Sequence, residues 1–85
     1  MDNAEELRAQ RRVAFGAALR EARTKQGLTQ EAVALKAGLD RSFYVEIETA
    51  VHSVSLDRVF AITDTLGIEL SELLTDQVFR PTPQA

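Results

Sequence analysis

The stretch that most constrains this chain is residues 28–48, LTQEAVALKAGLDRSFYVEIE. Thr29 is a residue type that caps helix N-termini, and a compact apolar run follows it. Gly38 then stands where a helix end favours a residue that can adopt positive φ. Asp40 can cap a second helix that runs to about Glu48. Two helices joined by so short a turn must cross steeply, which predicts a helix-turn-helix.

Helical periodicity also marks the chain on both sides of this motif. Residues 15–26 carry apolar side chains at i, i+4 and i+7, and Gly27 ends that predicted helix. Ser55 can cap a fourth helix that stops at Gly67, and a short fifth helix is expected over 68–74. The sequence therefore predicts an all-α fold, a compact five-helix domain that contains the helix-turn-helix.

The composition excludes several classes of function. The 85 residues suffice for one small domain, with no room for a separate small-molecule effector domain. The absence of cysteine excludes disulfides and cysteine-based zinc sites. With His52 as the single histidine, the sequence indicates no metal cluster and no catalytic nucleophile–base pair, so we expect no enzyme and no cofactor. No apolar run approaches the roughly 20 residues of a membrane span, so we expect a cytoplasmic protein without a membrane partner.

The charge is divided unevenly along the chain. Residues 1–41 carry eight basic and six acidic side chains, and residues 42–85 carry two basic and seven acidic ones. The balances are +2 and −5, which together give the net charge of −3. Phosphate binding depends on the local potential rather than the total, so this charge neither requires nor forbids a nucleic-acid partner.

Five short segments give the sequence a recognisable order: Gly27-Leu28-Thr29-Gln30-Glu31, Ala37-Gly38-Leu39, Ser42, Ile47-Glu48 and Ser55-Leu56. In this order and spacing they resemble the lambda-repressor-like helix-turn-helix family, the XRE or Cro/C1 type, over about Phe15 to Leu74. Within it, LDRSFYVEIE is most similar to the small controller proteins of restriction–modification systems. We expect residues 15–75 to form the DNA-binding domain, with 1–14 extending its first helix. Residues 76–85 are expected to be a disordered tail or, alternatively, a strap across a partner subunit.

The proposed contacts to bases lie at the start of the second motif helix. In a helix-turn-helix the first residues of that helix point at base edges in the major groove of double-stranded DNA. This assigns base reading to Arg41, Ser42 and Val45. Arg41 has the planar fork of donors that suits guanine O6 and N7.

The proposed phosphate contacts are spread over several elements. Gln30 opens the first motif helix, where its amide and the free helix N–H groups suit a phosphate, and the family uses its matching glutamine in this way. Secondary candidates are Lys25, Lys36, His52 and, on the flank of the second motif helix, Phe43. For the two lysines and His52, the alternative is a plain solvated side chain. Arg8, Arg11 and Arg12 on the first helix are further cations within possible reach of a DNA backbone, or simply a solvated helix start. For Arg23, the resemblance implies a structural ion pair rather than base reading.

Four positions depart from the family pattern. Ala50 replaces a usual glycine, so the turn there must differ or carry strain. Thr49 replaces a common basic residue, Val54 a frequent proline, and Glu46 adds a negative charge to the second motif helix. These departures weaken the case for strong DNA binding but leave the expected fold intact.

Apolar side chains on the fourth and fifth helices exceed what one small core can hold. We therefore expect a homodimer through Phe60, Ile68, Leu70 and Leu73. The leading hypothesis is a sequence-specific DNA-binding transcriptional regulator that acts as a homodimer on a near-palindromic operator. The alternative is a protein-interaction module of the same fold, such as an antitoxin or adaptor, which the acidic second half favours.

Overall fold

The computed structural model describes residues 3–75 and residue 78. Over these residues the chain forms four α-helices and one 3-10 turn, and no strand occurs among them. The α-helices are α1 (Asn3–Lys25), α2 (Gln30–Ala37), α3 (Arg41–Glu48) and α4 (Leu56–Leu66), followed by η1 (Leu70–Glu72). The predicted all-α fold is confirmed. No helix within the described ranges is both long and apolar enough to cross a membrane.

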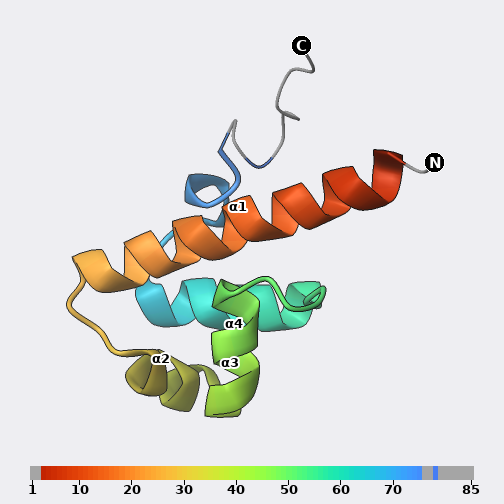
Figure 1. The fold of residues 1–85 in the computed structure, drawn as a ribbon. Coiled ribbons are helices and arrows are strands. Elements are labelled where there is room, and N and C mark those ends of the chain that lie inside the picture. The colour runs from red at the N-terminus through yellow and green to blue at the C-terminus, as the bar shows by residue number, and fades with distance from the viewer. Residues whose placement is uncertain (1–2, 76–77, 79–85) are drawn as a thin grey trace.

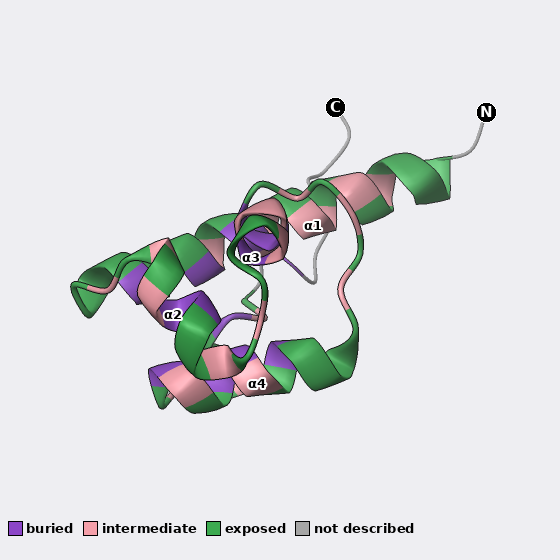
Figure 2. Ribbon diagram, turned by 90° about the horizontal axis from the view of Figure 1, so that it is seen from below, coloured by how far each residue is buried: buried purple, intermediate pink, exposed green. Residues whose placement is uncertain are grey.

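The helices surround one core. Figure 1 shows α1 above α2 and α3, with α3 steeply inclined to it, and the view from below in Figure 2 separates α4 from α1. Helix α2 packs on both α3 and α4, and α3 packs on α1. The buried core residues come from every α-helix and from the segment after η1: Leu19, Val33, Ala34, Tyr44, Ile47, Ile62, Leu66 and Leu73. Figure 2 shows these buried surfaces turned toward one another.

The helix boundaries follow the local signals predicted from the sequence. Thr29 accepts a hydrogen bond from the Ala32 N–H at 3.0 Å, and Ser55 accepts one from the Arg58 N–H at 3.2 Å. Gly38 closes α2 in the left-handed region, at φ 73°. These caps satisfy backbone groups that a helix leaves without an internal partner. The predicted caps at Thr29, Gly38 and Ser55 are therefore confirmed.

The fifth predicted helix is only a single 3-10 turn. It spans Leu70–Glu72, and Leu73 N–H donates to the Leu70 carbonyl at 2.9 Å in the i→i+3 pattern. A segment this short gains few hydrogen bonds in return for fixing its backbone, so a longer α-helix does not form. The predicted tail, 76–85, lies outside the described residues except for Val78, whose side chain is 8 % exposed.

Candidate nucleic-acid interface

Helix α3 presents its first turn away from the body of the protein. Asp40 caps it by accepting hydrogen bonds from the Ser42 and Phe43 N–H groups at 3.0 and 3.3 Å. Tyr44 and Ile47 face the core, at 0 % and 3 % exposed, as predicted. The carboxyl end of α3 lies against α1, so its amino end is the free one (Figure 1). The helix is therefore anchored at one end and open to a partner at the other.

The three predicted base readers do not share one environment. Arg41 and Ser42 are exposed at the free end of α3, whereas Val45 is half-buried one turn later. The Asp40 carboxylate beside them is already occupied by backbone N–H groups, as the sequence indicated. The exposed face of the first turn thus carries one guanidinium and one hydroxyl, which are groups that can read base edges.

The side chain of Gln30, predicted to bind a phosphate, is directed toward another residue of the protein. It is half-buried, and its Nε2 donates to Glu48 Oε1 at 3.1 Å. One N–H of its amide therefore already has a protein acceptor, which leaves only the other for an external phosphate. The amide is thus only partly available for the phosphate contact predicted from the sequence.

The acceptor of that bond belongs to a buried charged pair. Glu48, the last residue of α3, pairs with Arg23 in the last turn of α1, and Arg23 also donates to the Leu28 carbonyl at 2.8 Å. The structural ion pair implied for Arg23 is confirmed. Burial raises the pKa of Glu48, but the hydrogen bond from Arg23, with others, outweighs it, so the pKa of this carboxyl is lowered overall. Tyr44 Oη is buried beside this pair with no hydrogen bond to a described atom, and burial, then the Glu48 carboxylate, raises its pKa.

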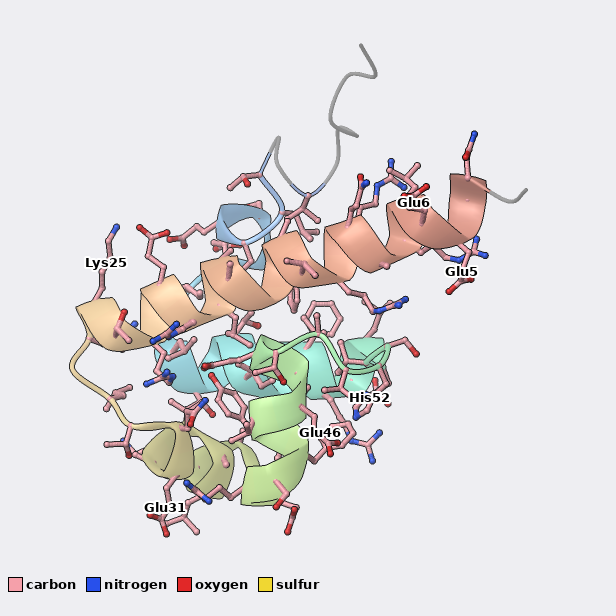
Figure 3. All side chains as sticks on the ribbon, viewed as in Figure 1. Glu5, Glu6, Lys25, Glu31, Glu46 and His52 are labelled. Atoms are coloured by element: carbon pink, nitrogen blue, oxygen red, sulfur yellow. The ribbon has the colours of Figure 1, made fainter. Side chains whose placement is uncertain are left out.

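Phe43 lies in an aromatic and charged cluster on the flank of α3. The ring of His52 stacks on it with centroids 5.0 Å apart and an interplanar angle of 26°. The guanidinium of Arg58 lies 4.8 Å from the centroid of the same ring, within cation–π range. His52 also reaches Glu46 on α3, and Figure 3 shows these two side chains directed toward each other. Sequence reasoning did not identify Arg58, because nothing local relates the start of α4 to a phenylalanine on α3.

The remaining predicted cations are dispersed. Lys25 and Lys36 are both exposed, at the end of α1 and in the last turn of α2. Figure 3 places Lys25 and His52 on opposite sides of the molecule. Arg8, Arg11 and Arg12 line a groove of about 340 Å³ together with His52 and apolar side chains of α4 and η1. Arg8 also pairs with Glu5 at 3.0 Å.

The predicted dimer contacts are only partly at the surface. Phe60 is 47 % exposed on α4, and Ile68 and Leu70 are half-buried. Leu73 is 2 % exposed and belongs to the core of its own chain, so its assignment to an interface is wrong. Leu56, one turn before Phe60, is 65 % exposed and enlarges the apolar face instead.

Comparison with known proteins gives the same motif. A helix-turn-helix family model matches residues 19–73. The control protein C.MunI of a Mycoplasma species is 41 % identical over 66 residues, which cover 76 % of this chain and 89 % of the relative. The control protein C.BamHI of Bacillus amyloliquefaciens is 34 % identical over 64 residues, which cover 74 % and 79 % of the two chains.

Two solved structures share the fold. The restriction–modification controller protein C.AhdI from Aeromonas hydrophila is 44 % identical with a TM-score of 0.70, covering 72 % of this chain and 92 % of that one. The clp gene regulator ClgR from C. glutamicum is 26 % identical with a TM-score of 0.77, covering 87 % and 96 %.

Proposed function

The chain belongs to the helix-turn-helix family, and from this premise we propose that it is a sequence-specific DNA-binding transcriptional regulator of the controller type. The membership confirms the resemblance predicted from its sequence. The main observation that supports the proposal is the position of α3. Its amino-terminal turn exposes Arg41 and Ser42, while its carboxyl end is fixed in the core through Glu48. A helix held this way can enter a major groove without reorganising.

The proposed regulator acts in the cytoplasm as a homodimer on a near-palindromic operator. One small domain makes few base contacts, and useful specificity needs two half-sites about one helical turn, roughly 34 Å, apart. The exposed side chains of Leu56 and Phe60 on α4, together with the half-buried Ile68 and Leu70, support self-association. A two-fold arrangement would pair this face with itself.

The test is a DNA-binding titration on fragments from the region upstream of the protein's own gene and on scrambled duplexes. We expect tighter binding to one upstream fragment. We also expect affinity to fall as salt rises, by about 0.9 log unit per log unit of salt for each phosphate neutralised. Sedimentation of the free protein and of the complex checks the dimer, and Leu56→Glu with Phe60→Glu should leave a monomer. Binding indifferent to sequence and salt would instead favour the protein-interaction alternative, for which the acidic second half is the supporting feature.

A further inference from the structure

Both ring nitrogens of His52 face hydrogen-bond acceptors. Its Nδ1 lies 2.8 Å from the Ser53 carbonyl oxygen, and its Nε2 lies 2.9 Å from Glu46 Oε1. A carbonyl and a carboxylate accept hydrogen bonds and cannot donate them. A neutral imidazole carries one N–H and satisfies only one of these contacts, whereas the imidazolium satisfies both. The geometry therefore matches the charged form of the ring.

The same ring is in contact with the helix proposed to enter the groove. It stacks on Phe43 and binds Glu46, and these residues lie on α3 at a spacing of three, on one side of the helix. We propose that His52, as a cation, is a positioning residue for α3, and that DNA affinity therefore falls when His52 loses its proton. This inference rests on the proposed function, because it assigns a pH response to the same DNA-binding surface.

Some charged side chains around His52 favour its protonated form, and others oppose it. On α3, Glu46 is the anion that favours the imidazolium. On α4, Arg58 contacts the Phe43 ring, and on α1, Arg8, Arg11 and Arg12 line the groove that His52 also lines, so these four cations oppose it. The hydrogen bond to the Ser53 carbonyl first, and then the one to the Glu46 carboxylate, outweigh the effect of desolvation and raise the pKa of His52 above its ordinary value.

Deprotonation changes two features of this surface. The charge of Glu46 is no longer balanced, so the flank of α3 becomes more negative by one unit where it would approach phosphates. The neutral ring must also give up one of its two contacts, which releases either Glu46 or the loop at Ser53. Both changes weaken DNA binding. We expect DNA affinity to fall roughly three- to tenfold as pH rises through the pKa of His52. This is the size of effect that one partly screened charge produces.

The single histidine allows a direct test. In the NMR spectrum of the full chain, only His52 contributes an imidazole Hε1 titration. We expect its midpoint above the ordinary value of about 6.5, and a lower midpoint in Glu46→Gln. Binding of the cognate duplex is then measured from pH 6 to 8.5 at one salt concentration. Affinity should fall with pH in the unmodified protein and stay nearly level in His52→Gln, which keeps a donor but cannot gain a proton.

A matched control variant distinguishes the effect of the His52–Glu46 contact from a general effect of removing negative charge. Glu31→Gln removes an acidic side chain from the exposed surface of α2, away from His52 (Figure 3), and should leave both the midpoint and the pH response of binding unchanged. The inference is overturned if His52 titrates at or below about 6.5 regardless of Glu46, or if His52→Gln keeps the full pH dependence. If no duplex is bound at any pH while the raised midpoint persists, the proposed function fails and the DNA role of His52 fails with it.

Discussion

Arg23 and Glu48 are joined side chain to side chain across the α1–α3 contact, with Arg23 Nε donating to Glu48 Oε2 at 2.6 Å and Nη2 to Oε1 at 3.0 Å. Their side chains are 9 % and 2 % exposed. The pair fixes the carboxyl end of the proposed recognition helix against the long helix above it. Two parallel hydrogen bonds between planar groups also restrict the relative orientation of the guanidinium and the carboxylate, and so of the two helices that carry them.

Removing one partner of this pair should be costly. Arg23→Met keeps most of the apolar volume but leaves the Glu48 carboxylate buried without its cation. We expect a loss of about 3–5 kcal/mol in the free energy of unfolding, measured by urea titration at one fixed protein concentration. Arg20→Met, at an exposed position of the same helix, should stay within about 0.5 kcal/mol. A loss below about 1 kcal/mol for Arg23→Met would show that the pair does not hold α3.

The same carboxyl group should make stability depend on acid pH. Burial raises the pKa of Glu48, but hydrogen bonding to Arg23 and its neighbours lowers it overall. The folded pKa thus lies below the unfolded one, so this contribution is present above the unfolded pKa and is lost as pH falls through the folded one. Urea midpoints between pH 6 and 2 should fall more steeply for the unmodified protein than for Glu48→Gln. Equal slopes would contradict a lowered pKa.

Gly16 should tolerate no side chain. It is buried in the middle of α1, and an added Cβ would lie 2.9 Å from the Ile47 carbonyl oxygen and clash with the Glu48 carbonyl. Alanine normally stabilises a helix interior by about 1 kcal/mol over glycine. Here we expect Gly16→Ala to destabilise by about 1–3 kcal/mol, because α1 and α3 must separate. Ala17→Gly, on the exposed side of α1, is the control and should lose about 1 kcal/mol through helix propensity alone.

Ala50 should gain stability on substitution by glycine. Among the described residues it alone, apart from glycines, has a positive φ, of 62°, which fulfils the expectation of strain at this turn. The left-handed region costs a residue with a Cβ about 1–2 kcal/mol, partly offset by the greater unfolded entropy of glycine. Ala50→Gly should therefore raise the free energy of unfolding by about 0.5–1 kcal/mol. A β-branched residue, Ala50→Val, should lower it, and a rise with Val would refute strain as the cause.

Arg41 and Gln30 should differ in what they do for DNA. Arg41→Ala should cost about 1–3 kcal/mol on the cognate duplex and less on a scrambled one, because a guanine contact is lost only at the specific site. Gln30→Ala should weaken both duplexes by similar factors, since a phosphate carries no sequence. It should also cost some stability through its bond to Glu48. An unchanged ratio of the two affinities in Arg41→Ala would exclude Arg41 as a base reader.

The sequence by itself determined the helices of the motif and the inward face of α3. Thr29, Gly38, Asp40 and Ser55 act on backbone groups within four residues, so their effect can be predicted from neighbours along the chain. The spacing of Tyr44 and Ile47 likewise fixed which side of α3 is buried. The ion pair of Arg23 was implied only by the family resemblance.

Only the tertiary structure decided which side chains of different helices and loops contact one another around the proposed DNA-binding surface and the core. Gln30 turns to Glu48, His52 bridges Glu46 and Phe43, Arg58 covers the same ring, and Leu73 fills the core rather than a surface. These residues approach one another through the crossing of helices, and a side chain's partner there depends on packing rather than on local spacing. Periodicity tells which face of a helix is apolar, but the packed helices decide which polar atoms meet across the faces.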